Sequence, residues 1–231
     1  MSDCFNIKVL TFNVWGIPII AKKKNERLIK IGEELIRKQF DIVALQEVWM
    51  YSDFIRIRDT LKSRYIYAHY FHSGLVGSGC CVFSVFPISQ VYDHAFTLNG
   101  YPYKIWHGDW YAGKSVGMCR LQITPTYSLK FYVTHLHADY NGDRNYDDHR
   151  LAQAYELVQF IRNTSSASEP VMVVGDLNFQ SNELGYKLIV KLSGLIHAYT
   201  ERQDKSTIDE ASDSNGFRKF PVCTIYFLTN Q

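Results

Sequence analysis

The chain has 231 residues, of which 46% are hydrophobic and 15% aromatic, and this is enough apolar material for the core of one globular domain. Its formal net charge is +2, and the basic residues cluster only at positions 22–24 and on the polar face of the helix predicted to follow. This balance disfavours a protein that grips nucleic acid, because such proteins concentrate Lys and Arg on one face.

The first predicted elements are a strand and an amphipathic helix. The segment Ile7 to Trp15 is β-prone and poor in charge, so it predicts an interior strand that ends near Asn13. Asn25 is a candidate cap for a helix that follows. Its predicted apolar face consists of Leu28, Ile31, Leu35 and Ile36.

A second short strand is predicted at Asp41–Glu47, where the hydrophobic period changes. It delivers Glu47 as the first anionic side chain after the apolar core of the strand. A carboxylate there can bind a hard divalent cation such as Mg²⁺, which prefers oxygen ligands. The simpler interpretation is a solvated glutamate at a strand end.

The run Gly74–Gly79 is rich in glycine, which invites a nucleotide-binding interpretation. A nucleotide loop would open a helix, and a P-loop would contain a Gly-Lys-Ser/Thr sequence. This run instead leads into the β-like segment Cys80–Phe86, so it predicts a tight turn before a core strand.

Two further strands end in polar residues. Leu129–His137 is β-rich and finishes with His135 and His137 on one face. Val171–Val174 leads into the run Gly175-Asp176-Leu177-Asn178, in which alternation places Asp176 and Asn178 on the same side. Taken alone, this run is more simply interpreted as a turn.

Helices are predicted after each of these strands. Asp147 and Asp148 begin one helix, and Asn182 is a candidate cap for the next. The predicted inward faces are Leu151, Ala154, Tyr155, Val158 and Ile161 for the first helix, and Leu184, Leu188 and Leu192 for the second.

Five polar side chains therefore stand at four strand ends: Asn13, Glu47, His135, Asp176 and Asn178. Each has an ordinary structural explanation by itself. Together they predict one site that can hold a metal ion or a phosphate, because strand ends in α/β folds carry binding residues.

The motifs Phe12–Gly16, Leu45–Trp49, Thr134–His137 and Gly175–Asn178 resemble those of the endonuclease/exonuclease/phosphatase superfamily of magnesium-dependent phosphodiesterases. Within it, the chain is more similar to neutral sphingomyelinases than to nucleases. The runs that carry this likeness are residues 13–18, 73–79, 98–103, 107–110 and 134–138. The resemblance implies a four-layer α/β/β/α sandwich with two facing mixed β-sheets.

The resemblance also implies a function, namely magnesium-dependent hydrolysis of sphingomyelin to ceramide and phosphocholine. Glu47 would bind Mg²⁺, while Asn13 and Asn178 would position the phosphate or a metal-bound water. His135, if protonated, would donate to a phosphate oxygen, and Asp176 would orient the attacking water. The expected partner is a phospholipid at a membrane surface, with no nucleic acid and no obligate protein partner.

The aromatic stretch Tyr101–Tyr111 is interpreted as a possible contact for the choline group, because aromatic faces attract quaternary ammonium ions. Trp110 is the residue chosen to test it. Ordinary core or edge packing is the simpler explanation for any one of these rings.

The sequence departs from the family in two places. The Ser-Asp-His motif that carries the general base is absent, and His197 stands where an Asp is expected. We therefore expect residues 1–231 to form a single domain that lacks its last strands and the family's C-terminal membrane segments. Without its base the enzyme would be slowed by about 10²–10⁴-fold, so activity in this chain is doubtful.

Two alternatives stay open. One is a nuclease or inositol-phosphate phosphatase of the same superfamily, and the other is a catalytically inactive lipid-binding fragment. The five cysteines are odd in number and lack a C-x-x-C spacing, which suggests a reducing compartment. The sequence shows no signal peptide and no transmembrane span. The resemblance implies an intracellular location, at a membrane surface in the full-length family.

Overall fold

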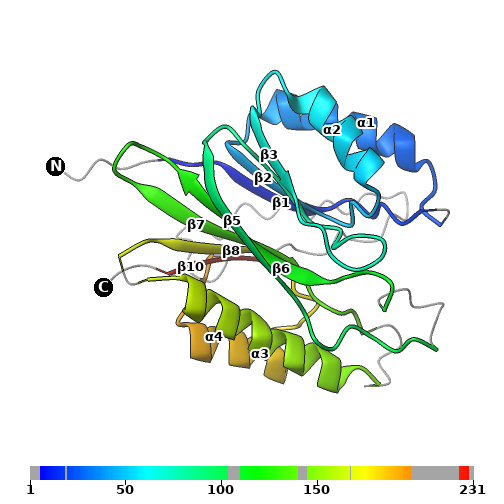
Figure 1. The fold of residues 1–231 in the computed structure, drawn as a ribbon, viewed down its shortest axis with the longest axis vertical. Helices are drawn as coiled ribbons and strands as arrows, with labels where there is room; N and C mark the ends of the chain where they lie inside the picture. The colour runs from blue at the N-terminus through cyan, green and yellow to red at the C-terminus, as the bar shows by residue number, and fades with distance from the viewer. Residues whose placement is uncertain are drawn as a thin grey trace.

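The computed structural model describes residues 6–18, 20–103, 110–139, 145–166 and 168–198, together with the backbone of 224–228. Two β-sheets face each other, and one pair of helices covers the outer face of each sheet (Figure 1). The predicted α/β/β/α sandwich with two facing mixed sheets is therefore confirmed.

The first sheet has four strands in the order β1-β2-β4-β3. β1 and β2 are parallel, and the remaining pairs are antiparallel. Apolar residues of α1 and α2 pack with this sheet in one core, which explains why both helices lie on its outer face. The bounds are β1 Val9–Asn13, α1 Lys24–Lys38, β2 Ile42–Gln46, α2 Tyr51–Leu61, β3 Tyr67–Tyr70 and β4 Cys81–Ser84.

The second sheet has six strands in the order β5-β6-β7-β8-β10-β9. Only β7 and β8 are parallel within it. Its outer face packs against α3 and α4 in a second core. The bounds are β5 Ile88–Ala95, β6 Ser115–Gln122, β7 Ser128–His135, α3 Asp147–Thr164, β8 Val171–Asp176, α4 Leu184–Ser193, β9 Ile196–His197 and β10 Thr224–Leu228.

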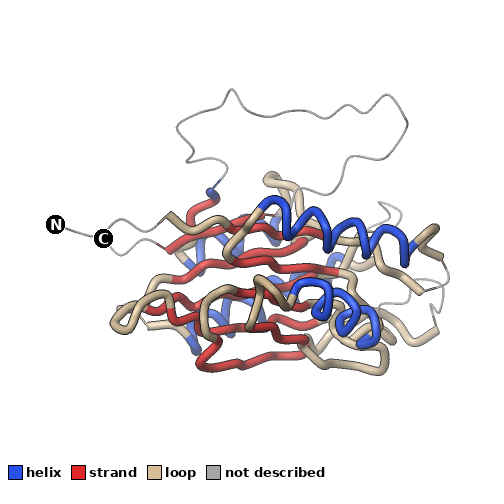
Figure 2. Tube along the Cα trace, turned by 90° about the horizontal axis from the view of Figure 1, so that it is seen from above, coloured by secondary structure: helices blue, strands red, loops and turns tan. Residues whose placement is uncertain are grey.

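A third core lies between the two sheets, and its apolar side chains come from both of them. Ile42 and Ala44 of β2 meet Phe131 and Val133 of β7 and Val174 of β8. The stacked strand layers are visible in Figure 2. This inter-sheet core holds the two parallel strand pairs in a fixed relation, and therefore also their polar ends.

The C-terminal strand β10 pairs antiparallel with β8 on one side and with β9 on the other. β8 is thus flanked by β7 and β10 and does not form an edge of the sheet. The prediction that the fold continues in strands and membrane segments beyond this sequence stays a prediction. No helix in the described ranges is long and apolar enough to cross a bilayer.

The predicted start and face of α1 need correction. The residue that caps α1 is Lys23, whereas Asn25 lies within the helix and accepts a hydrogen bond from Arg56. Of the predicted face, Leu28 and Leu35 are buried, but Ile36 is exposed. The cap prediction failed because the helix begins two residues earlier, in a backbone turn that does not use a side-chain cap.

The predicted face of α3 is also shifted. Ala154, Val158 and Ile161 are buried as expected, but Tyr155 is exposed and Arg150 is buried. A polar side chain occupies the inward face because it has hydrogen-bond partners there, which a pattern of hydrophobic residues cannot reveal.

The predicted face of α4 is correct only in part. Leu188 is partly buried against the core as expected, but Leu184 and Leu192 are exposed, while Gly185 and Ile189 are buried. The close approach of Phe179 explains why a glycine faces inward, since a Cβ on Gly185 would overlap the Phe179 ring.

Candidate functional site

The centre of the candidate site is the side-chain amide of Asn13 at the end of β1. Its Nδ2 donates to Glu47 Oε1 at 2.7 Å and to Asp176 Oδ2 at 3.1 Å. Its Oδ1 accepts a hydrogen bond from the backbone N–H of Trp15 at 2.9 Å. One side chain of the first sheet therefore clamps two carboxylates, one from each sheet.

Strand register explains why these residues meet. Asn13 pairs with Gln46 across β1 and β2, so Glu47 is the next residue beyond the pair. On the second sheet, His135 pairs with Asp176 across the parallel strands β7 and β8. Parallel neighbours end at the same edge of a sheet, and the inter-sheet core brings the two edges together.

Glu47 has one oxygen held by Asn13 and one without a hydrogen bond. Its Oε2 is buried and accepts none. Burial raises the pKa of the Glu47 carboxyl, as does the nearby Asp176, while the Asn13 amide, the Lys114 ammonium and the Trp49 side chain act against that rise. The backbone of Glu47 is left-handed, with φ of 62°, a conformation that costs a residue with a Cβ about 1–2 kcal/mol.

His135 lies next to Asp176 and is almost fully buried. Burial lowers the pKa of His135 well below its usual value, and the charges of Lys114 and His137 contribute in the same direction. The imidazole is therefore neutral at neutral pH and donates through one ring nitrogen only. A donor role for His135 does not need the protonated form that the sequence prediction assumed. The Trp49 ring lies 6.1 Å from the His135 ring, centre to centre.

Asp176 and Asn178 are joined by a local hydrogen bond, from the Asn178 backbone N–H to Asp176 Oδ1 at 3.2 Å. The Asn178 side chain donates from Nδ2 to the carbonyl of Leu136 at 2.8 Å. Asn178 is left-handed as well, with φ of 52°. Gly175, with φ of 142°, lies where a Cβ would overlap the Thr134 carbonyl, so this position requires glycine.

All five residues predicted from the sequence thus lie together at one end of the sandwich. Asn13, Glu47, Asp176 and Asn178 form a continuous set of hydrogen bonds, and His135 adjoins it through the strand register. Their roles stay predictions. In this arrangement both N–H groups of the Asn13 amide donate to carboxylates. Asn13 therefore has a positioning role in addition to the phosphate contact that the sequence analysis expects of this residue.

Two residues at the site were missed by the sequence analysis. Lys114 is buried and donates from Nζ to the Leu136 carbonyl at 2.9 Å, and its charge acts on both Glu47 and His135. The sequence contained an indication that Lys114 is buried, since it is the only charged residue in the run from Trp110 to Cys119.

The second missed residue is Arg150 of α3. Its guanidinium donates to the Asn178 carbonyl at 2.5 Å and to Glu183 Oε1 at 2.8 Å, and it stacks on the Phe179 ring. Arg150 therefore fixes the loop that carries Asn178. The signal was weak, because an arginine in an amphipathic helix normally faces solvent.

The residues present fit a hard divalent cation. Two carboxylates share one amide donor, and Glu47 keeps a buried oxygen without a hydrogen bond. No cluster of three or more His, Cys, Asp or Glu side chains arranged for a metal occurs in the described part of the chain. Mg²⁺ does not require such a cluster, because it binds through one or two carboxylates with waters and substrate phosphate.

A cavity of about 280 Å³ opens beside Trp49. Its walls include Tyr51, Tyr70 and His72, together with the glycine-rich segment predicted to be a turn before a core strand. That turn is confirmed, because β4 follows it directly. Of the aromatic stretch predicted as a choline contact, residues 104–109 lie outside the described residues, whereas Tyr101, Tyr103, Trp110 and Tyr111 are described, and Trp110 is half exposed. The predicted contact stays a prediction.

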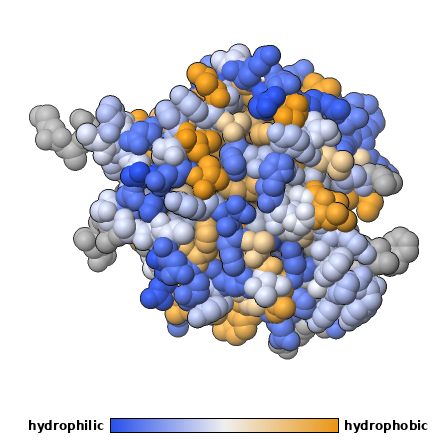
Figure 3. Space-filling model, in the orientation of Figure 1, coloured by the Kyte–Doolittle hydropathy of each residue, from blue (hydrophilic) through white to orange (hydrophobic). Residues whose placement is uncertain are grey.

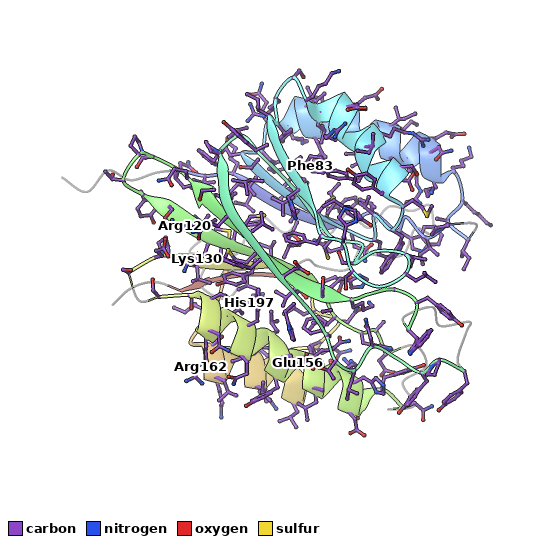
Figure 4. The ribbon with its side chains drawn as sticks, in the orientation of Figure 1. Phe83, Arg120, Lys130, Glu156, Arg162 and His197 are labelled. Carbon is purple, nitrogen blue, oxygen red and sulfur yellow. The ribbon has the colours of Figure 1, made fainter. Side chains whose placement is uncertain are left out.

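The main charged network lies at the other end of the second sheet. Glu169 pairs with Arg120 at 2.6 Å and with Lys130 at 2.8 Å, and the Lys130 hydrogen bond is the main reason that the pKa of Glu169 falls to about 2. Lys130 and His135 lie on the same strand, about 16 Å apart at 3.3 Å per residue. Figure 4 shows Arg120 and Lys130 at the left end of the strands, away from the site loops. The network is structural.

Two facing sheets whose parallel strand ends share an amide-clamped pair of carboxylates define an α/β sandwich with one candidate catalytic centre. The chain belongs to the Endonuclease/Exonuclease/phosphatase family, whose model matches residues 10–226.

Two curated relatives are similar over most of this chain. Human sphingomyelin phosphodiesterase 2 is 44% identical over 215 residues, which cover 92% of this chain and 51% of that protein. An inositol phosphosphingolipids phospholipase C of Schizosaccharomyces pombe is 38% identical over 192 residues, which cover 83% of this chain and 45% of that protein. The chain spans about half the length of the curated relatives it matches.

Among solved structures, a beta toxin mutant from Staphylococcus aureus with bound magnesium ions superposes with a TM-score of 0.75 at 17% identity. The match covers 98% of this chain and 85% of the toxin chain. At that identity the likeness supports the fold.

Proposed function

We propose that this chain is a sphingolipid phosphodiesterase that hydrolyses sphingomyelin to ceramide and phosphocholine with the help of Mg²⁺. The observation that carries the proposal is the Asn13 clamp, which holds Glu47 and Asp176 together beside His135. The names of the relatives, which refer to sphingomyelin and to inositol phosphosphingolipids, support a ceramide phosphodiester as the substrate.

The reaction needs charge stabilisation above all. Water attacks the phosphorus, the P–O bond to the lipid alcohol breaks, and one proton moves from the water to the departing alkoxide. Negative charge grows on the phosphoryl oxygens and on the leaving oxygen during this step. A divalent cation, when bound, would neutralise part of that charge.

Each side chain has a proposed task. Glu47 Oε2 would hold the cation, and Asn13 fixes the orientation of that carboxylate. Asp176 would orient the attacking water, since both of its oxygens are held by hydrogen bonds. Neutral His135 would donate one N–H to a phosphoryl oxygen, and the Lys114 charge would favour the anionic transition state.

The test is release of phosphocholine from sphingomyelin in mixed detergent micelles, with and without Mg²⁺, by the wild type and by Glu47→Gln. We expect magnesium-dependent release that Glu47→Gln reduces by at least about 100-fold. The substitution removes a buried charge and keeps the side-chain shape, so the melting temperature should not fall. Hydrolysis of inositol phosphoceramide is assayed in parallel. The faster of the two reactions shows whether the phosphocholine or the inositol phosphate head group is preferred.

The matched control is Glu34→Gln, which alters an exposed glutamate on α1 far from the strand ends and should leave release unchanged. Release that neither Mg²⁺ nor Glu47→Gln affects would eliminate the proposed site. No release by the wild type from either lipid would favour the inactive lipid-binding alternative.

A further inference from the structure

Five exposed apolar side chains lie on or beside the loops that line the cavity at Trp49, and we call them the apolar rim: Met50, Tyr51, Leu75, Val76 and Trp110. Leu75 is 82% exposed and Val76 39%, while Met50, Tyr51 and Trp110 are 41%, 49% and 49% exposed. Single exposed apolar residues are ordinary, but a contiguous group marks an interaction surface.

The rim is contiguous. Met50, Tyr51, Leu75 and Val76 line the same cavity. Trp110 joins them because the backbone N–H groups of Leu75 and Val76 both donate to the carbonyl of its neighbour Tyr111 at 3.3 Å. Figure 3 shows hydrophobic residues grouped at the right edge of the molecule, where the β3–β4 loop lies in Figure 1.

The rim is also held firmly. An antiparallel bridge pairs Gly74 with Ala112, and a Cβ on Gly74 or on Gly113 would overlap the backbone of the other loop. The Tyr51 ring lies 5.5 Å from the Tyr70 ring and 5.0 Å from the His72 ring. The backbone that carries the apolar side chains is therefore fixed, and these side chains stay exposed to solvent.

The rim adjoins the reacting groups. Met50 follows Trp49 directly, and the Trp49 ring lies 6.1 Å from that of His135. The backbone N–H of Val48, next to Glu47, donates to Gly79 of the same glycine-rich loop at 2.9 Å. A surface that docks on the rim thus lies beside Trp49 and, through it, close to His135.

The charge pattern identifies the surface that the rim fits. Four of the five rim residues come from sequence segments without charge, because no Lys, Arg, Asp or Glu lies between Arg64 and Asp93, nor between Glu47 and Asp53, whereas Trp110 directly follows Asp109. Anionic lipid or nucleic acid would be recognised through Lys and Arg, so an uncharged rim complements a surface without net charge. Exposed Trp and Tyr beside aliphatic residues are the side chains that favour a lipid–water interface.

We propose that the apolar rim is the docking surface of this chain for a zwitterionic phosphocholine bilayer. Leu75 and Val76 enter the boundary between head groups and acyl chains, as apolar anchors of interfacial segments do. The inference rests on the proposed function, because a sphingolipid presents its phosphodiester at the bilayer surface.

The experiment measures binding separately from catalysis. Vesicles of phosphatidylcholine without sphingomyelin are sedimented with the Glu47→Gln protein and with the same protein carrying Leu75→Glu. We expect Leu75→Glu to weaken vesicle binding at least tenfold. The matched control is Leu184→Glu, which places the same charge at a 65% exposed leucine of α4, on the outer face of the other sheet, and should bind like its parent.

Three results would overturn the proposal. These are a parent protein that does not bind the vesicles, equal binding by Leu75→Glu and Leu184→Glu, or binding that needs anionic lipid and disappears with salt. Self-association that Leu75→Glu abolishes, without vesicle binding, would assign the rim to a second copy of the chain instead. These vesicles contain no sphingomyelin, so the binding measurement does not depend on hydrolysis. If the proposed hydrolysis fails, vesicle binding still tests the docking surface.

Discussion

At the residue scale, the site depends on Asn13. Its amide donates to both Glu47 and Asp176, and those two carboxylates come from different sheets. In the absence of a cation, the Asn13 amide offsets part of the repulsion between the two carboxylates. With a cation bound, it would hold the carboxylates of Glu47 and Asp176 in the same relative orientation. Asn13 therefore has a positioning role for the two carboxylates, in addition to the substrate contact proposed for it.

The buried imidazole of His135 gives a pH prediction. The folded state holds His135 neutral because its pKa is well below the usual value, whereas the unfolded chain protonates it below about pH 6.5. The unfolded state binds more protons in that window, so the free energy of unfolding falls as pH falls through it.

Replacing His135 with Asn should therefore reduce the loss of stability below pH 6.5, by up to about 1.4 kcal/mol per pH unit. Thermal unfolding of both proteins between pH 5 and pH 8 measures this. Identical pH dependence in the two proteins would mean that His135 is not held neutral by burial. His94→Asn, at a histidine paired with Glu156 on the far side of the second sheet, is the comparison variant.

At the element scale, α3 does more than cover a sheet. Arg150 reaches from its first turn to the Asn178 carbonyl and to Glu183, and thereby connects the helix to the loop after β8. The sequence pattern predicted the helix but not this connection, because a period of hydrophobic residues carries no record of a buried polar side chain.

Arg150→Met should destabilise the fold by about 1.5 kcal/mol, since it removes charge-assisted hydrogen bonds from a buried guanidinium to two partly buried acceptors. It should also lower kcat about tenfold, because Asn178 loses its support. Steady-state kinetics and thermal unfolding report the two effects. Arg162→Met, at an exposed position of the same helix, should change neither. A stability loss with unchanged kcat would restrict Arg150 to a structural role.

At the scale of the whole molecule, the site exists only while the two sheets are held together. Asn13 and Glu47 belong to the first sheet and His135 and Asp176 to the second, so the core between the sheets sets the distance across the site. Packing in that core should then influence activity more than equally tight packing elsewhere.

Val174→Ala and Val158→Ala test this with matched chemistry. Both valines are fully buried, Val174 between the two sheets and Val158 on the inner face of α3 against the second sheet. Each substitution should cost about 1–3 kcal/mol, with the melting temperature falling by about 2–4 °C per kcal/mol. We expect only Val174→Ala to weaken magnesium-dependent turnover, by several-fold at a temperature where both variants are folded. Equal losses of turnover would show that the site responds to general stability.

The sequence by itself indicated β1, β2, β4, β7 and β8, the helices α1, α3 and α4 and the five polar residues at strand ends, because β-prone runs, amphipathic periods and polar termini are local patterns. It did not predict α2, β3, β5 or β6. It assigned the inward faces of α3 and α4 only partly correctly and missed Lys114, since those depend on partners distant in the chain. Only the tertiary structure decided that Asn13 joins Glu47 to Asp176, that His135 is neutral, and that the apolar rim stands beside them. These facts arise from packing two sheets face to face, which brings together atoms that no sequence spacing relates.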